Sequence, residues 1–467
     1  MTTKDLNIFI ELTEYLLQNE LEEPVAPYLD KDQLSEQLDL ELQDKGVIDE
    51  ELIRELKKVL RYTPKTASKS FFNQLFGGRI PKASLGELLS VMLNNSMYTY
   101  KVAGPQVGIE KEVIKQICRL IDYPSSASGT FAPGGSMTNM MALIMARDKK
   151  NPKIRESGNA QGMVLYTSAE SHYSIEKNAA LCGLGRSSVR KVHTDEKGEM
   201  LCSHLKQLIE DDLALGLIPF FVNATAGTTV LGAFDQLKGI NEICKAYNLW
   251  CHVDGAYCGG VIFSSRYRRL LANLNLTDSF SFNAHKMLGT PLSCSIIVTP
   301  HKDQLHHSFS NEADYLYQTA NDDFNLGKIS MQCGRRNDAL KIWTLWKSVG
   351  LNGLERIVDQ QFTLANIARE YIKSNDDYTL YSFDDSISVC FNYKNLPAKD
   401  LCTALYTGSE LMVGFGSRNG IDFVRLVTIN TSLDEESIIN FFKTLEAMVK
   451  LKFTEIFVPS NPEAPNR

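Results

Sequence analysis

A lysine stands directly after a histidine in the segment NAHKMLG, residues 283–289. Lys286 closes the run DSFSFNAHK, in which aromatic residues alternate with small polar ones, a pattern that predicts a half-buried or buried strand. An ammonium at the end of such a strand must reach water, pair with an acid, or serve as a reactive amine. An amine in an apolar setting can form a covalent bond to a carbonyl carbon. Lys286 is therefore a candidate nucleophile.

A carboxylate ends another apolar run, in the segment HVDGAY, residues 252–257. Asp254 could cap the helix that follows, a common structural role for aspartate. It could also hold a protonated nitrogen heterocycle, because a nearly buried carboxylate needs a partner and a pyridinium N–H supplies one.

A Gly-Gly-Ser turn opens an apolar helical pattern in FAPGGSMTNMMALIMAR, residues 131–147. The N–H groups of Gly135 and Ser136 and the helix dipole would make this end an anion site. The alternative is a flexible turn before a core helix. Neither GxGxxG nor GxxxxGK[ST] occurs in this segment, so a dinucleotide site or a P-loop finds no support here.

Two further segments carry side chains of uncertain role when each is taken alone. His172, in SAESHYSIEKNAA, could be a structural histidine near a helix start or an imidazole stacked on a planar ring. Thr225, in NATAGTTVLGAFD, could form turn and cap hydrogen bonds or contact a ligand.

Together and in this order, these residues fit one cofactor. Gly135 and Ser136 would hold a phosphate, and His172 would cover a ring. Asp254 would pair with the ring nitrogen, and Lys286 would bond to an aldehyde. That cofactor is pyridoxal phosphate, with Lys286 as its covalent anchor.

The elements that must position these residues follow from the rhythm of the chain. From about 120 to 300, short apolar runs alternate with helical patterns at about 30-residue spacing, which indicates βαβ units and a mainly parallel sheet. Thr225, Asp254 and Lys286 each lie at or just past a strand end, where ligands of such sheets bind. We expect three parts: helical residues 1–65, a large α/β domain over 66–345, and a small α+β domain over 346–467.

Composition excludes several classes of function. The 467 residues carry a formal net charge of −7, with 43% hydrophobic and 22% charged residues. The absence of a long basic run argues against nucleic acid, and no apolar stretch is long enough to span a bilayer. The ten cysteines are scattered without a CxxC pair or zinc-ligand spacing, so we expect reduced thiols, no metal site and a cytoplasmic protein.

The ordered blocks APGGSMTN, SAESHYSI, FVNATAGTTVLGAFD, HVDGAYCGG, NAHKM and MQCGRRNDALKIW resemble the group II pyridoxal-phosphate decarboxylases. The resemblance runs from about residue 70 to 430 and is strongest to the branch that acts on glutamate, cysteine sulfinate and aspartate. It implies fold type I, like aspartate aminotransferase: a mainly parallel sheet flanked by helices. Ala284 replaces the usual proline before the His-Lys pair, and Gly255 replaces an alanine after the aspartate.

The resemblance also implies residue roles. Lys286, His172, Asp254 and Tyr315 would be catalytic, with Tyr315 on a mobile loop as the proton donor and Tyr317 as the second choice. The cofactor-binding residues by this resemblance are Gly135, Ser136, His172, Thr225, Asp254, Ala256, Asn283, His285 and Lys286. Arg425 would grip the substrate α-carboxylate, for which a solvated strand arginine is the alternative.

The choice of substrate rests on three further positions. Gln74, in FFNQL, would meet the distal acid of the substrate. Ser96 and Tyr98, in LNNSMYTY, occupy places where glutamate enzymes tend to have Asn and Phe and cysteine-sulfinate-type enzymes tend to have Ser and Tyr. We therefore expect α-decarboxylation of a small acidic L-amino acid, with cysteine sulfinate or aspartate ranked above glutamate.

Other functions stay open. They are a glutamate decarboxylase that makes GABA, a decarboxylase of aromatic amino acids or histidine, a pyridoxal-phosphate lyase or aminotransferase, and a degenerate homologue that only binds a partner. Enzymes of this kind are homodimers in which both subunits build each active site, so the helical N-terminus would interlock with its partner.

Overall fold

The computed structural model describes residues 2–23, 25–158, 160–311 and 322–452. Tyr315 and Tyr317, the expected loop tyrosines, lie outside the described residues. The chain divides into two compact units. The large unit comprises residues 79–363 and 382–388, and the small unit comprises the described parts of 1–78, 364–381 and 389–467. The expected division at residues 65 and 345 stays a prediction about folding domains.

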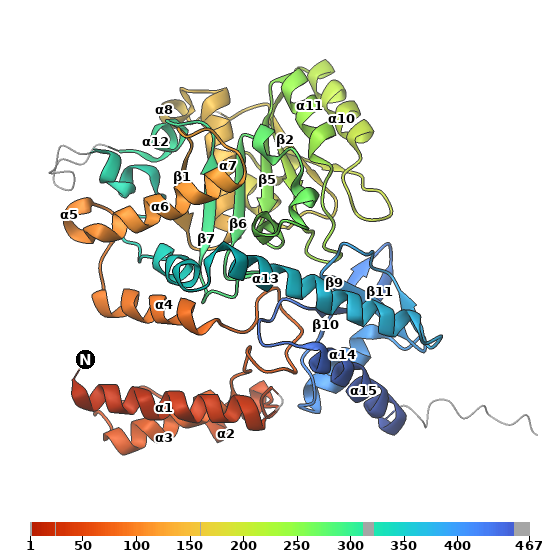
Figure 1. The fold of residues 1–467 in the computed structure, drawn as a ribbon. Helices are drawn as coiled ribbons and strands as arrows, with labels where there is room; N and C mark the ends of the chain where they lie inside the picture. The colour runs from red at the N-terminus through yellow and green to blue at the C-terminus, as the bar shows by residue number, and fades with distance from the viewer. Residues whose placement is uncertain (1, 24, 159, 312–321, 453–467) are drawn as a thin grey trace, which may run out of the picture. The chain divides into compact units, whose positions relative to one another are not determined.

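A seven-stranded sheet forms the centre of the large unit, with the strand order β1-β7-β6-β5-β4-β2-β3 (Figure 1). The strands are β1 (Ser128–Ala132), β2 (Met163–Ser168), β3 (Val189–Val192), β4 (Ile218–Thr225), β5 (Trp250–Gly255), β6 (Ser279–Asn283) and β7 (Ser295–Thr299). The pairs from β3 to β6 are parallel, whereas β7 is antiparallel to both β6 and β1. The sheet is therefore mainly parallel, as expected.

Helices surround this sheet because its central strands are buried along their whole length and must be covered. The helices of the large unit are α4 (Pro81–Leu93), α5 (Tyr100–Ala103), α6 (Pro105–Leu120), α7 (Gly135–Lys150), α8 (Ile154–Ser157), α9 (Ser174–Leu181), α10 (Cys202–Ala214), α11 (Leu237–Tyr247), α12 (Gln304–Phe309) and the first part of α13 (Ala339–Lys373). Helix α7 packs against β1, β4, β5, β6 and β7, and its residues share a core with Phe221 and Trp250.

Helix α13 contains one break. Gly350 has φ +65° and ψ −178°, so two helical segments meet there. Short 3-10 helices complete the secondary structure: Lys31–Gln33, Arg186–Ser188, Gly259–Phe263, Arg268–Leu271, Leu274–Leu276, Asp322–Phe324 and Leu326–Ile329.

The small unit combines N-terminal helices with a C-terminal sheet. Its four strands follow the order β10-β11-β9-β8 in the sheet, and helix α14 lies between β9 and β10 in the chain. The elements are α1 (Thr3–Glu22), α2 (Leu34–Gln37), α3 (Asp49–Tyr62), β8 (Tyr378–Leu380), β9 (Ser388–Tyr393), α14 (Ala398–Thr407), β10 (Gly414–Arg418), β11 (Ile421–Val427) and α15 (Glu435–Lys452). Residues 70–72 join this unit through hydrogen bonds between Phe72 and Met412 (2.8 Å) and between Met412 and Ser70 (3.0 Å).

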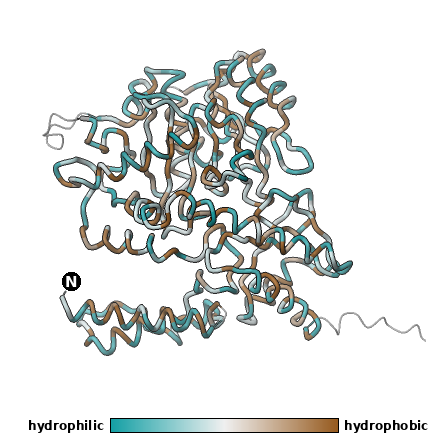
Figure 2. The backbone as a smooth tube through the Cα atoms, viewed as in Figure 1, coloured by the Kyte–Doolittle hydropathy of each residue, from teal (hydrophilic) through white to brown (hydrophobic). Residues whose placement is uncertain are grey.

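Helices α1 and α3 expose apolar side chains, whereas the central strands of the large sheet are buried. Helices α1 and α3 alternate between hydrophilic and hydrophobic residues (Figure 2), and Leu6, Ile10, Leu17 and Leu52 are exposed on them. In the described ranges, no helix is both long and apolar enough to cross a membrane. All ten cysteines are described, and all are free thiols.

Candidate active site

Lys286 lies three residues beyond the end of β6. The turn that carries it is closed by two backbone hydrogen bonds, from Lys286 N to Asn283 O (3.1 Å) and from Gly289 N to Lys286 O (3.2 Å). Its neighbours His285 and Met287 are buried, and Lys286 itself is half-buried. The amine is thus presented from a largely dry segment at the carboxyl edge of the sheet.

Asp254 lies at the same edge, on β5. It stands directly across from Thr225 on β4 in the parallel register of the two strands. The carboxylate is only 4% exposed, and each oxygen accepts one hydrogen bond. Oδ1 accepts from the N–H of Ala256 (3.0 Å), and Oδ2 accepts from Nδ2 of Asn139 on α7 (2.7 Å). Two donors satisfy part of the four lone-pair sites of a carboxylate, which leaves capacity for a ligand N–H.

Thr225 is held by the loop that follows β4. Its N–H donates to Oδ2 of Asp235 (2.7 Å), and its hydroxyl lies 3.1 Å from the hydroxyl of Ser171. Asp235 is buried and also accepts from the N–H of Met200 (2.6 Å). Burial raises the pKa of Asp235 to about 7. Asp235 therefore holds the end of β4 in place, and with it the position of Thr225 opposite Asp254.

His172 is half-buried just before α9, where its Nδ1 accepts the N–H of Ser174 (3.2 Å). Burial lowers the pKa of His172, the negative charge of Asp254 raises it, and the positive charge of Lys286 lowers it further. The imidazole therefore lies within electrostatic reach of both the candidate acid and the candidate amine. Three segments far apart in the chain converge on one place.

The N-terminus of α7 lies close to the residues that follow Asp254 and precede Lys286. A Cβ built on Gly135 would lie 2.9 Å from the Cβ of Ala256 and 3.1 Å from Nδ2 of Asn283, so only glycine fits. The carbonyl of Ser136 accepts from Nδ2 of Asn178 (2.8 Å), which holds the first turn. The first N–H groups of an α-helix have no partner within the helix and favour an anion.

His285 supplies a further donor. The N–H of Cys294 donates to its Nδ1 (2.9 Å), so the proton of a neutral ring sits on Nε2. Burial lowers the pKa of His285 to about 3, and the charge of Lys286 adds to this effect. His285 is therefore a neutral N–H donor.

The family described as "Pyridoxal-dependent decarboxylase conserved domain" matches residues 32–394, most of the chain. The chain belongs to this family. A pyridoxal-dependent decarboxylase is a carboxy-lyase, which confirms the expected enzyme class and cofactor.

Comparisons with individual proteins support the same family assignment. The chain is 40% identical to cysteine sulfinic acid decarboxylase of Homo sapiens over 375 residues, covering 79% of this chain and 76% of that protein. It is 34% identical to acidic amino acid decarboxylase GADL1 of Bos taurus over 445 residues, covering 90% and 85%. A crystal structure of mouse CSAD matches with a TM-score of 0.90 at 34% identity, over 96% of this chain and 99% of that one. The expected α/β fold of pyridoxal-phosphate decarboxylases is confirmed.

The residues of the decarboxylase fit pyridoxal phosphate. The buried Oδ1 of Asn283 has no hydrogen-bond partner within the described ranges. It borders the helix end at Gly135, where a Cβ would lie 3.5 Å from it. The N-terminus of α7 and the neutral His285 suit the phosphate of the cofactor. The buried carboxylate of Asp254 suits its ring nitrogen, and the amine of Lys286 suits its aldehyde.

Ser96 and Tyr98 belong to the large unit. The hydroxyl of Ser96 contacts the carbonyl of Cys333 (3.4 Å), and the carbonyl of Tyr98 accepts the N–H of Gly327 (2.9 Å). Both of these contacts are with residues 327–333, which follow the expected tyrosine loop in the chain.

Gln74 and Arg425 belong to the small unit, where the structure brings them near each other. Nη2 of Arg425, on β11, donates to the carbonyl of Asn73 (3.2 Å), the residue before the exposed Gln74. Gly414 stands opposite Arg425 in the antiparallel pair of β10 and β11.

Sequence reasoning missed Asn139 and Asp235. Asn139 is one helical turn after Gly135, and a polar residue at that spacing inside an otherwise apolar helix was the available signal. Asp235 ends the segment NATAGTTVLGAFD, but its role depends on the loop that folds it back onto Thr225.

Proposed function

We propose that this enzyme removes the α-carboxylate of a small acidic L-amino acid, with cysteine sulfinate or aspartate preferred over glutamate. The relatives at 40% and 34% identity are a cysteine sulfinic acid decarboxylase and an acidic amino acid decarboxylase, and this supports the substrate class. The observation that carries the proposal is the convergence of three segments at one edge of the sheet. The hydroxyl of Ser171, next to His172, lies 3.1 Å from that of Thr225, which stands opposite Asp254, and β6, which leads to Lys286, pairs with β5.

Lys286 and Asp254 have defined tasks in this proposal. Lys286 would hold the cofactor covalently through its side-chain amine. Bound pyridoxal phosphate supplies an electron sink for the electron pair left by the departing carboxylate. Asp254 keeps a proton on the ring nitrogen by accepting its N–H, which makes that sink effective.

Other residues hold and cover the cofactor. Gly135 and Ser136 bind the phosphate through the helix end, assisted by Asn283 and His285. His172 stacks on the ring face, and the methyl group of Ala256 packs against the ring. Thr225 hydrogen-bonds next to Asp254, as its place opposite that residue allows.

Four residues are proposed for substrate recognition. The planar guanidinium of Arg425 matches the α-carboxylate, because its two parallel N–H groups fit two carboxylate oxygens. Gln74 meets the distal acid, and Ser96 and Tyr98 shape the preference. Tyr315, or Tyr317 in its place, would donate a proton to the carbon that has lost CO₂.

Assembly and location complete the proposal. We propose a homodimer in which both subunits contribute to each active site, with residues 1–65 interlocked between the subunits. The exposed apolar side chains of α1 and α3 support such packing. Ten free thiols support a reducing, cytoplasmic setting.

A comparison of acids tests the substrate. Purified protein loaded with pyridoxal phosphate is given cysteine sulfinate, aspartate and glutamate in turn, and CO₂ release is measured as kcat/KM. We expect the first or second to exceed glutamate. A higher value for glutamate would make the protein a glutamate decarboxylase, and no CO₂ from any of the three would refute the acidic substrate class.

A further inference from the structure

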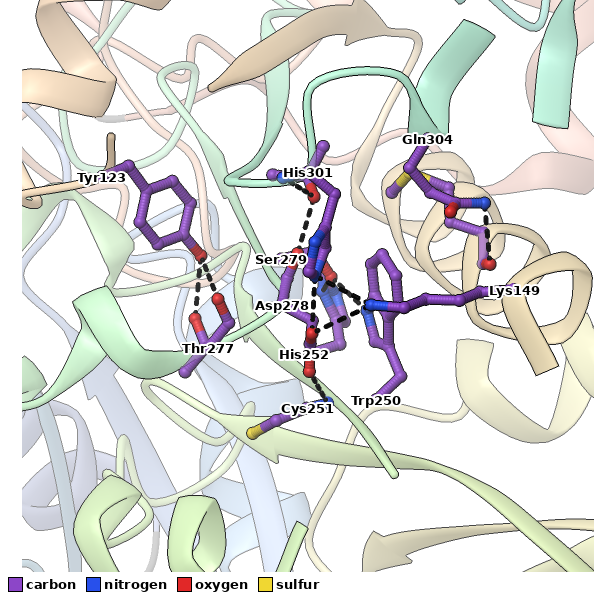
Figure 3. A network of polar contacts seen from close by, with 12 residues as sticks. Tyr123, Lys149, Trp250, Cys251, His252, Thr277, Asp278, Ser279, His301 and Gln304 are labelled. Atoms are coloured by element: carbon purple, nitrogen blue, oxygen red, sulfur yellow. Dashed lines mark hydrogen bonds and ion pairs between the residues drawn. The ribbon is translucent and has the colours of Figure 1, made fainter. Parts of the chain in front are cut away.

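A chain of buried polar groups leads from the middle of the sheet to Asp254. Nε1 of Trp250 donates to Oγ of Ser279 (2.8 Å), and that oxygen lies 2.8 Å from Nδ1 of His252. Nε2 of His252 lies 3.1 Å from Oδ1 of Asn139, whose Nδ2 donates to Asp254 at 2.7 Å. Figure 3 shows Trp250, His252 and Ser279 together. We call Trp250, Ser279, His252 and Asn139 the indole relay.

The direction of every hydrogen bond in the indole relay is fixed from both ends. An indole N–H can only donate, and a carboxylate can only accept. At the carboxylate end, Asn139 must present Nδ2 to Asp254, so its Oδ1 faces His252 and requires a donor there. The proton of His252 therefore sits on Nε2, and the bare Nδ1 accepts from the hydroxyl of Ser279. At the other end, the oxygen of Ser279 accepts the N–H of Trp250, which leaves the hydroxyl proton of Ser279 to donate to His252.

The indole relay keeps this polarity because it is dry. His252 and Ser279 are 0% exposed, and Asn139 is 1% exposed. Burial lowers the pKa of His252 to about 4, against the raising effect of Asp254, so the ring is neutral at physiological pH. A neutral ring has one donor and one acceptor, and the relay uses both.

We infer that the indole relay positions Asp254 for the cofactor. The N–H of His252 holds Oδ1 of Asn139, and this leaves Nδ2 of Asn139 to face Asp254. In that orientation the amide donates a hydrogen bond that holds the carboxylate in place. In the reverse orientation, Oδ1 would face the carboxylate and repel it. His252 and Ser279 are thus positioning residues that act through Asn139. This inference rests on the proposed pairing of Asp254 with the ring nitrogen.

The affinity of the apoprotein for pyridoxal phosphate tests the inference without any amino-acid substrate. His252→Phe keeps a flat ring and removes both nitrogens, and Asn139→Ala removes the donor to Asp254. We expect His252→Phe to weaken cofactor binding by about 10-fold, the usual effect of losing order in a hydrogen bond to a charged group. The double variant should bind as weakly as Asn139→Ala and no weaker, because His252 acts through Asn139.

A matched control separates positioning from packing. Tyr123→Phe removes another buried hydroxyl of the same region, which bonds to Thr277 at 2.8 Å (Figure 3) and does not reach Asp254 through the relay. It should leave the affinity within about 2-fold. The unfolding temperature of each apoprotein is measured in parallel, since a purely structural role would lower that temperature and leave the affinity unchanged.

Three outcomes overturn the inference: wild-type affinity in His252→Phe, fold-losses that multiply in the double variant, or an equal loss in Tyr123→Phe. If His252→Phe does not fold, Ser279→Ala takes its place, since it removes the donor to Nδ1 of His252. Asp254→Asn tests the underlying pairing separately. Wild-type affinity there would refute the pairing, and a wrong choice of amino acid would change none of these results.

Discussion

Gly135 and Ala256 approach each other so closely that a Cβ on Gly135 would lie 2.9 Å from the Cβ of Ala256. Gly135 is the first residue of α7, and Ala256 comes directly after the end of β5, two residues beyond Asp254. The same added carbon would lie 3.1 Å from Nδ2 of Asn283. The helix end, the acid and the segment before Lys286 therefore share one small space, and that space admits no side chain at position 135.

Gly135→Ala is expected to reduce the affinity for pyridoxal phosphate by about 10-fold or more, because the methyl group displaces Ala256 or Asn283 from the phosphate end. Titration of the apoprotein with cofactor measures it. Gly108→Ala is the control: this glycine lies within α6, and its added Cβ meets nothing within 4 Å. That variant should keep its affinity and gain up to about 1 kcal/mol in unfolding free energy. Equal affinities in both variants would contradict the proposed phosphate site.

Two neighbouring arginines should differ sharply in their contribution to stability. Arg335 is 8% exposed and forms two hydrogen bonds to Glu110, at 2.7 and 2.6 Å, whereas Arg336 pairs with Glu87 at 2.9 Å in an exposed position. Arg335→Met leaves the buried Glu110 charge unpaired and should cost about 3–5 kcal/mol. Arg336→Met should cost less than about 1 kcal/mol. Urea unfolding measures both, and similar losses would show that burial does not govern these pairs.

The free energy of unfolding should fall in acid partly because of His252. The pKa of this residue is about 4 in the folded protein, against about 6.5 for an ordinary histidine. Between these values the unfolded state binds a proton that the folded state does not, so stability present above pH 6.5 is lost as the pH falls toward 4. From pH 7 to pH 5 the loss from this residue is about 2 kcal/mol. Unfolding of His252→Phe at the two pH values should show a correspondingly smaller difference than wild type. An unchanged difference would mean that His252 is charged inside the fold.

Substrate preference should respond to Ser96 and Tyr98. The double variant Ser96→Asn, Tyr98→Phe is expected to shift the kcat/KM ratio toward glutamate by about 10-fold, within the range that one pocket contact provides. Competing decarboxylation of cysteine sulfinate and glutamate measures the ratio. Because Gly327 lies against the ring of Tyr98, Tyr98→Phe keeps that packing and removes only the hydroxyl. A ratio that does not move would remove both residues from the substrate site.

The sequence was sufficient to predict the mainly parallel sheet and the place of Lys286, Asp254 and Thr225 at its carboxyl edge. Strong apolar runs end in these residues, and the parallel register puts the ends together. The strand before Lys286 is shorter than the pattern suggested: it ends at Asn283, and a turn carries the lysine.

Strand β1 was not anticipated, because its residues Ser128–Ala132 include glycine and small polar side chains that do not mark a strand. Gly129 is required there, since a Cβ would lie 2.7 Å from the carbonyl of Ile297 on β7. The indole relay was also invisible in sequence. His252 and Ser279 become neighbours only through the register of β5 with β6, and Asn139 reaches them from a helix more than a hundred residues away.

Reduction of the holoenzyme with borohydride, followed by peptide mapping, locates the covalent bond between the cofactor and the protein. The reduction makes the bond between cofactor and protein permanent, so the pyridoxyl label marks the residue that holds it. We expect a label on Lys286 alone and none in the Lys286→Ala variant. A label on another lysine, or no label in wild-type protein loaded with pyridoxal phosphate, would contradict this expectation.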